Sequence, residues 1–372
     1  MECDDWSTFR IDPCRCATVS LLPTLEGRET IMDTTTYGLD IAKRVFQMYW
    51  VEPETGEIMN RRFSRQQLIE FLGQRVAGRV ALEACGSAHW WARKIAALGH
   101  EVILLHAKFI RPFVQNNKTD AADARAICIA AQQPGMRFVA PKTADQQATL
   151  ALHRLRSLLV KSRTMQVNQL RGLLYEFGVV LTAGRVAGLA DVRERLHEVE
   201  QVVPGTLFDA LRDQLQLIDR IDGDIKKLEK QLATWQRQES ACKKIAGIPG
   251  IGPLTATALV ATIGNPAAFK SGRELAAYLG LVPRQTGTGG RVRLGGISKR
   301  GDNYIRMLLI HGARAVLFKS KNKGPWCDQI LLRRPVNVAT VALANKMART
   351  AWALLAHDQT YQHDYAAMRQ AA

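Results

Sequence analysis

Four carboxylates stand where secondary-structure elements are expected to begin or end. Asp40 closes the strand-like stretch YGLDIA, Glu83 closes RVALEA (79–84), and Asp120 and Asp123 open the alanine-rich segment 119–131. A spacing of three residues puts Asp120 and Asp123 on one face of a helix. Carboxylates at the edge of a central sheet, facing a helix with two more, converge on one point. Such hard oxygen ligands suit Mg²⁺ or Mn²⁺, and two such ions can cleave a phosphodiester.

Each acid taken singly has an ordinary explanation. Asp40 could cap a turn, and Asp120 and Asp123 could complement a helix dipole. Glu83 is harder to explain, because an unpaired carboxylate at the end of a buried strand is costly. Taken together with the order of the elements, the four acids favour a metal site that is both catalytic and ion-binding.

A serine in an arginine-rich segment is a second candidate for chemistry. The segment RVRLGGISKRGDNYIR surrounds Ser298 with Arg291, Arg293, Lys299, Arg300 and Arg306, opposed by Asp302. Cations of this kind can orient a scissile phosphate and stabilise the transition state of attack by a hydroxyl. The alternative is that Ser298 caps the helix that follows it, the commoner role of serine.

Glycine-rich turns and isolated cations are candidates for contact with a phosphate backbone. GIPGIG (247–252) is typical of a helix-hairpin-helix element, in which Gly250 and Gly252 let backbone N–H groups approach a phosphate, although a tight turn without ligand explains it too. RQTGTGGRVR (284–293) lacks the G-K-[ST] ending of a nucleotide-binding loop, so we expect a flexible basic loop over 284–297. The residues expected to bind nucleic acid are Lys118, Arg125, Gly250, Gly252, Arg284, Arg291, Arg293, Lys299 and Arg300.

The elements that position the four acids have the pattern of an α/β domain over 32–142. Three short strands (YGLDIA, VFQMYWV and EIMNRRF) predict a meander, and two later strands (RVALEA and EVILLH) predict parallel crossovers. Between them we expect an amphipathic helix that Ser64 caps and that carries Leu68, Leu72 and Val76, and a second helix that Gly99 stops. Thr119 is the expected cap of the helix with Asp120 and Asp123.

The rest of the chain is predicted to be helical. In the connector 143–243, Leu152, Leu155 and Leu159 mark one face of a long helix, and an apolar stripe runs through a second helix over 206–240. That stripe has the spacing of a coiled-coil seam, which dimerisation or packing on the same chain would explain equally well. Residues 244–372 form a further helical domain, and residues 1–31 are interpreted as a disordered leader or an over-extended start, outside the fold.

The composition points to a polyanionic partner. The 372 residues carry 51 Lys and Arg against 34 Asp and Glu, a formal charge of +17, and nucleic acid is the commonest soluble polyanion. The seven cysteines show no C-x-x-C spacing, so neither a disulfide framework nor a zinc site is indicated and reduced thiols in a cytosol are expected. No apolar run is long enough for a membrane span.

Six motifs in order resemble the DEDD transposases of insertion sequences over roughly residues 36–355. GLDIAK, LEACGSAHWWAR and NNKTDAADARAI resemble the RuvC-type branch of the ribonuclease-H-like superfamily. GIPGIGPLTATALVATIG, FKSGRELAAYLGLVP and GGISKRGDNYIRMLL resemble the second, helical transposase domain of the same family. The resemblance implies that Asp40, Glu83, Asp120 and Asp123 take the metal-ligand positions and that Ser298 forms a covalent 5′-phosphoserine link to DNA.

The same resemblance implies the partners. It implies DNA strand exchange at donor and target sites, guided by a structured non-coding RNA from the element and carried out in the prokaryotic cytoplasm at the nucleoid. It further implies dimers that form a synaptic tetramer, with Ser298 of one protomer meeting the carboxylates of another.

Two rival functions follow from the same residues. A Holliday-junction resolvase or other metal nuclease would use only the four acids and water, and its products would have free ends. A non-catalytic DNA-binding protein would use only the hairpin and the basic loops, and it would keep its activity without the acids.

Overall fold

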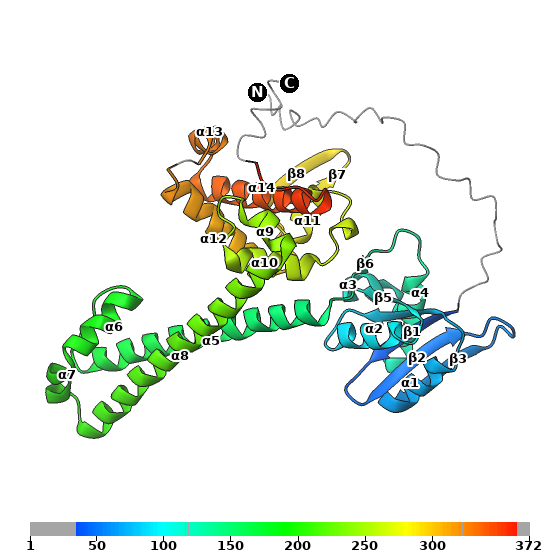
Figure 1. Ribbon diagram of the computed structural model, residues 1–372, viewed down its shortest axis with the longest axis horizontal. Helices are drawn as coiled ribbons and strands as arrows, with labels where there is room; N and C mark the ends of the chain where they lie inside the picture. The colour runs from blue at the N-terminus through cyan, green and yellow to red at the C-terminus, as the bar shows by residue number, and fades with distance from the viewer. Residues whose placement is uncertain (1–34, 116, 118, 322, 363–372) are drawn as a thin grey trace.

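The computed structural model describes residues 35–362 apart from 116, 118 and 322. The expected leader 1–31 and Lys118 lie outside the described residues. Figure 1 shows three parts along the chain: an α/β part, a long helical arm, and a compact helical part that carries a small β-hairpin.

The α/β part is built on a mixed sheet in the order β3-β2-β1-β4-β5-β6. The first three strands form an antiparallel meander and β4 and β5 run parallel to β1, as the sequence predicts. The strands are β1 (Thr36–Ile41), β2 (Val45–Val51), β3 (Ile58–Ser64), β4 (Arg79–Glu83), β5 (Glu101–Leu105) and β6 (Phe138–Val139). Strand β6, which adds an antiparallel edge to β5, was not expected.

Helices cover both faces of this sheet. The helices are α1 (Arg65–Gly73), α2 (Ala88–Ala96), α3 (Ala107–Ile110), a 3₁₀ turn η1 (Arg111–Phe113) and α4 (Asp120–Ala131). Helices α1 and α2 bury Leu68, Leu72 and Trp91 against one face, and α4 buries Ala126 and Ile127 against the other. A mixed sheet with helices on both faces fits the ribonuclease-H-like fold that the resemblance implies.

The predicted caps of α1 and α4 are confirmed. The Ser64 and Thr119 side chains accept hydrogen bonds from the first turns of α1 and α4, and Gly99 has the positive φ of a helix stop. The expectation for Val76 was wrong, because α1 ends at Gly73 and Val76 is exposed in the turn that follows.

The arm is a helical hairpin formed within one chain. It consists of α5 (Ala144–Glu176), α6 (Arg185–Glu194), α7 (Leu196–Val202) and α8 (Gly205–Gln238). The predicted stripe of α8 packs along α5, and the ion pairs Arg156–Glu229 and Arg163–Asp222 join the two helices. Packing on the same chain therefore accounts for the stripe. On α5, however, Leu155 is exposed, and His153 is buried.

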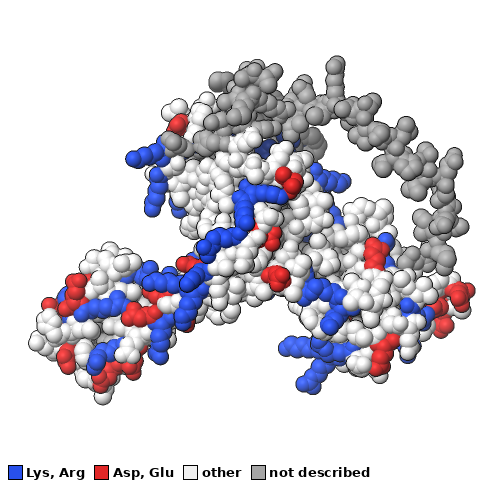
Figure 2. Space-filling model, viewed as in Figure 1, with Lys and Arg blue, Asp and Glu red and all other residues white. Residues whose placement is uncertain are grey.

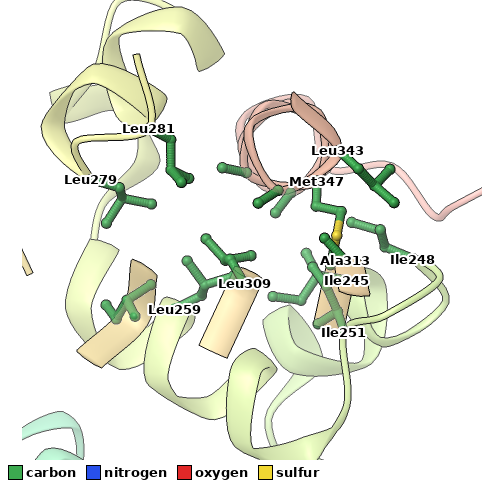
Figure 3. Close-up of a cluster of buried hydrophobic side chains, with 14 of the residues drawn as sticks. Ile245, Ile248, Ile251, Leu259, Leu279, Leu281, Leu309, Ala313, Leu343 and Met347 are labelled. Carbon is green, nitrogen blue, oxygen red and sulfur yellow. The ribbon is translucent and has the colours of Figure 1, made fainter. Parts of the chain in front are cut away.

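The helical part has its own core. It contains α9 (Ser240–Ala246), α10 (Pro253–Ile263), a 3₁₀ turn η2 (Pro266–Ala268), α11 (Gly272–Tyr278), α12 (Asn303–Lys319), α13 (Pro325–Arg333) and α14 (Val336–Ala356). Figure 3 shows Leu259, Leu309 and Met347 from α10, α12 and α14 meeting in this core.

The expected loop over 284–297 is a β-hairpin. Strands β7 (Pro283–Thr288) and β8 (Arg291–Ile297) pair antiparallel around the turn at Gly289 and Gly290, which both have positive φ. Nearly every residue of this hairpin is exposed. The prediction of a loop was wrong because no buried face imposes the apolar alternation that identifies a strand.

Candidate active site

Asp40 and Glu83 are neighbours at one edge of the sheet. Strands β1 and β4 run parallel with Leu39 opposite Leu82, and each acid is the next residue along its strand. Because side chains alternate, the apolar Leu39 and Leu82 face α1 and α2 while the two acids face α4. Both are half-buried. Their charges act together on the Cys85 thiol, whose pKa is raised first by burial and then by Glu83 and Asp40.

Gly38 lets α4 lie directly on the strand that carries Asp40. A Cβ atom at Gly38 would be 2.2 Å from the Ala124 carbonyl oxygen and 2.5 Å from the Cys128 nitrogen, so a larger residue would force α4 away from the strand. Asp120 and Asp123 open this helix and are exposed and half-buried, respectively. The four predicted acids therefore belong to one face of the sheet and to the helix that covers it.

The acids are not drawn into a tight cluster. Over residues 35–362, with the three undescribed positions set aside, no three His, Cys, Asp or Glu side chains lie close enough to hold a metal ion. The donor set has the right chemistry for a hard divalent cation, since it consists of carboxylate oxygens on converging elements. The structure thus places Asp40 beside Glu83 and places Asp120 and Asp123 together on α4.

A row of polar side chains continues from the acids across the sheet, and sequence reasoning missed it. Gln47 lies opposite Asp40 and is 7% exposed; its amide donates to Asn60, and Arg62 donates to its oxygen (3.3 Å). Asn60 donates to the Ala121 carbonyl at 3.2 Å, which ties the first turn of α4 to β3. A glutamine inside the apolar stretch VFQMYWV was the available signal, because a buried amide needs partners.

Ser298 is not a helix cap. Helix α12 begins at Asn303, and the Asp302 side chain caps it by accepting from the N–H groups of Tyr304 and Ile305. Ser298 instead follows β8, and its N–H donates to the Val282 carbonyl at 2.8 Å. Its Oγ is buried and has no hydrogen-bond partner among the described residues. A buried hydroxyl without a hydrogen-bond partner lowers the stability of the folded state by about 1–3 kcal/mol, so Ser298 is not placed here for stability.

The backbone around Ser298 is tightly constrained. Lys299 has a φ of 53°, a left-handed conformation that a side chain disfavours. A Cβ at Gly280 would lie 2.2 Å from the Arg300 carbonyl oxygen, so this loop rests on the glycine that ends α11. Arg306, itself 6% exposed, donates to the carbonyls of Leu279 (2.9 Å) and Arg300 (2.8 Å). The loop is therefore held in place from both sides.

The predicted nucleic-acid contacts differ in their surroundings. Arg125 on α4 is exposed. The basic residues of the hairpin and of the Ser298 loop are also exposed, namely Arg284, Arg291, Arg293, Lys299 and Arg300. Gly250 packs against the backbone of Gly312 on α12, because a Cβ atom at Gly250 would be 2.8 Å from the Gly312 carbonyl oxygen. Gly250 therefore serves the packing of the helical part. Gly252 is exposed and directly precedes α10.

The carboxylates and Ser298 belong to different parts of the chain. The α/β part meets the helical part through Lys142, whose Nζ donates to the Thr262 carbonyl (3.4 Å), and through the Arg137–Glu274 ion pair (2.6 Å). In the view of Figure 1 the β7–β8 hairpin, which leads into Ser298, lies at the upper edge of the helical part, and the sheet lies below and to the right. The structure therefore shows two candidate groups, one on the sheet and α4 and the other after β8 in the helical part.

Comparison with known proteins agrees with this layout. Residues 37–178 match a DEDD transposase family model, and residues 242–326 match the model described as the transposase IS116/IS110/IS902 family. A probable family 20 transposase of Pseudomonas aeruginosa is 44% identical over 89% of this chain and 99% of its own. The transposase for insertion sequence element IS1328 of Yersinia enterocolitica is 39% identical over 86% and 96%, respectively. The transposase for insertion sequence element IS1111A of Coxiella burnetii is 38% identical over 90% and 93%. The chain that carries these two groups of residues belongs to the IS116/IS110/IS902 family of insertion-sequence transposases.

Proposed function

We propose that this transposase cuts and rejoins DNA with the four carboxylates and Ser298 acting together, the serine holding the cut strand covalently. That the chain is an enzyme that cleaves and recombines DNA follows from its family. This excludes the hypothesis of a non-catalytic DNA-binding protein. The observation that carries the proposal is that Asp40, Glu83 and the first turn of α4 share one face of the sheet.

In the proposed mechanism the acids bind a divalent cation, Mg²⁺ or Mn²⁺. Asp40 and Glu83 would hold it from the stiff sheet, and Asp120 and Asp123 from α4. When bound, the cation polarises the scissile phosphate and offsets charge on the leaving oxygen. The chain supplies the placement: Gly38 sets the approach of α4 to β1, and the Asn60 bond to Ala121 fixes its first turn.

Ser298 supplies the nucleophile in this proposal. Its Oγ attacks phosphorus, the P–O3′ bond breaks, the 3′ oxygen takes up a proton and leaves as a hydroxyl, and the serine proton passes to solvent. The phosphodiester bond energy is kept in a 5′-phosphoserine, so the 3′-hydroxyl of another strand can attack it and rejoin the DNA. The unpartnered Oγ and the neighbouring cations Lys299 and Arg300 support this role.

The placement of the two groups on separate parts of the chain supports an active site assembled from two protomers. We propose that Ser298 of one protomer meets the carboxylates of another in a dimer or tetramer, because the carboxylates belong to the α/β part and Ser298 belongs to the helical part. No described helix is long and apolar enough to cross a membrane.

We propose in addition that a structured RNA encoded beside the gene guides the choice of DNA. Figure 2 shows Lys and Arg side chains running from the helical part along the arm, a surface that suits a nucleic-acid backbone. The test is to sequence the RNA that co-purifies with the protein at moderate salt. One discrete RNA species from the element is expected, and a mixture of host RNA would contradict guidance.

The carboxylate role is tested with Asp120→Asn, matched by Asp145→Asn, an exposed acid in the first turn of α5. Asp120→Asn should abolish recombination and weaken Mn²⁺ binding while DNA binding persists, because it removes a ligand and a charge together. Asp145→Asn should behave as wild type. Full recombination by Asp120→Asn would refute the metal site.

The serine role is tested on a nicked suicide substrate, followed by denaturation and digestion. A DNA-linked peptide containing Ser298 is expected, absent in Ser298→Ala and present in the matched variant Ser320→Ala, at the end of α12. If Ser298→Ala recombines normally, or the DNA ends emerge free of protein, the rival mechanism of a metal nuclease that uses water is correct.

A further inference from the structure

An exposed tryptophan borders the edge of the sheet at which Asp40 and Glu83 lie. Trp90 is in the first turn of α2 and is 40% exposed. Its ring stands edge-on against Trp91, with centroids 4.8 Å apart, and Trp91 is buried against Phe46. The exposed Trp90 ring is therefore held in place by its contact with a side chain of the core of the α/β part.

Two cations flank this ring. The Arg65 guanidinium lies 5.4 Å and the Lys94 ammonium 5.6 Å from the Trp90 centroid, and among the described aromatic residues Trp90 alone has two cations within this range. Both distances are near the outer limit of about 6 Å for a cation–π contact, so a planar ligand can displace Lys94 from the Trp90 ring at little cost, while Arg65 keeps its closer contact with Trp91 (4.9 Å). Arg65 also donates to the Lys43 carbonyl at 3.2 Å, which joins α1 to the exposed turn Lys43–Arg44.

The connections of this patch lead directly to the acids. The turn with Lys43 and Arg44 follows Asp40 along the chain, and the turn into α2 follows Glu83. That second turn contains Ser87 at a φ of 67°, a strained conformation of the kind that collects at functional sites. Figure 2 shows Lys and Arg side chains gathered at this end of the α/β part, on the side of the arm.

We propose that the patch formed by Lys43, Arg44, Arg65, Trp90 and Lys94 binds an unpaired DNA strand, with one base stacked on Trp90 and the flanking phosphates on the cations. An aromatic ring with basic neighbours is the combination that holds single strands without regard to sequence. A duplex cannot use the ring, because its bases are already stacked. The choice of DNA rests on the proposed cleavage at Asp40 and Glu83, which a strand crossing this edge of the sheet would reach.

The test measures binding of the full-length protein to a fluorescent 12-nucleotide DNA strand by anisotropy in EDTA, so that no metal is involved. Trp90→Ala should weaken binding by about 5- to 150-fold, the range for loss of one stacked base. Trp90→Phe should keep most of the affinity, and Tyr175→Ala, which removes an exposed aromatic of the arm, should keep all of it. Thermal melting confirms that each variant is folded.

Two comparisons separate stacking from a general loss of charge. Lys94→Gln should lower the slope of log affinity against log salt by about 0.7, the contribution of one phosphate contact on a single strand, while Trp90→Ala leaves that slope unchanged. A strand with an abasic site at the stacked position should bind wild type and Trp90→Ala equally well.

Unchanged single-strand affinity in folded Trp90→Ala, or a loss seen with an RNA strand of the same sequence but not with DNA, would overturn the proposal. The result does not depend on catalysis, because Asp40→Asn enters the same assay. Recombination by Asp40→Asn would refute the proposed function and leave the binding result standing.

Discussion

Replacement of Gly38 by alanine should separate the two halves of the carboxylate site. The added Cβ would lie 2.2 Å from the Ala124 carbonyl, and ordinary contact begins at 3.4 Å, so the backbone of α4 must retreat by about 1.2 Å. Backbone atoms of a helix cannot move singly, so the first turn with Asp120 and Asp123 shifts with Ala124. Overpacking of this kind costs about 1–3 kcal/mol of stability.

The shift should have a larger effect on chemistry than on folding. A misplacement of about 1 Å in a catalytic group can cost about a hundredfold in rate, and Gly38→Ala is expected to reduce recombination by that order. The assay is recombination of a plasmid substrate in Mg²⁺, with Mn²⁺ affinity and thermal unfolding measured on the same protein. Weakened Mn²⁺ affinity with a modestly lowered melting temperature is the expected combination.

The matched control is Gly73→Ala at the end of α1. No described atom lies within 4 Å of a Cβ built there, and the change should stabilise the helix by about 0.4–1 kcal/mol without effect on activity. If Gly38→Ala recombines at the wild-type rate, the approach of α4 to β1 does not set the active site and the argument fails.

Three further predictions concern the arm and the Ser298 loop. Burial lowers the pKa of His153 from 6.5 to about 4, so between these pH values the unfolded chain binds more protons than the folded chain. The contribution of a neutral His153 to the free energy of unfolding should therefore be fully present above pH 6.5 and be lost as the pH drops to 4. His153→Gln should flatten the free energy of unfolding, measured with urea, over this pH window. Arg306→Leu leaves the Leu279 and Arg300 carbonyls without donors, costing about 1–3 kcal/mol each by thermal unfolding, whereas exposed Arg314→Leu should be nearly neutral. Gly280→Ala should displace the Ser298 loop and reduce the DNA-linked product, with Mn²⁺ affinity intact; a normal yield would contradict the packing argument.

The order of elements around the carboxylates could be read from the sequence. Apolar alternation and short buried runs identify β1 to β5, and local signals such as the Ser64 and Thr119 caps fix where helices begin. These signals work because they depend on residues within one turn or one strand. They were sufficient to place Asp40 and Glu83 at strand ends and Asp120 on a helix.

What the sequence could not determine depends on contacts between distant segments. The β7–β8 hairpin has no buried face and so no periodicity, and β6 is two residues held by β5. Leu155 resembles a core residue by its spacing, yet α8 covers another side of α5. A hydrophobic pattern shows which face of an element is apolar, but not which element will cover it.

The same limit applies to the candidate site. In the sequence Gly38 is only a small residue in a strand, and the structure shows that α4 packs directly against it. Ser298 resembles a helix cap in the sequence, but in the structure Asp302 caps α12. Trp90 appears in the sequence as one of two adjacent tryptophans, of which the fold buries Trp91 and leaves Trp90 at the surface between Arg65 and Lys94. Residue types set the available chemistry, whereas burial and close approach, which are properties of the packed chain, decided which of these residues can carry it out.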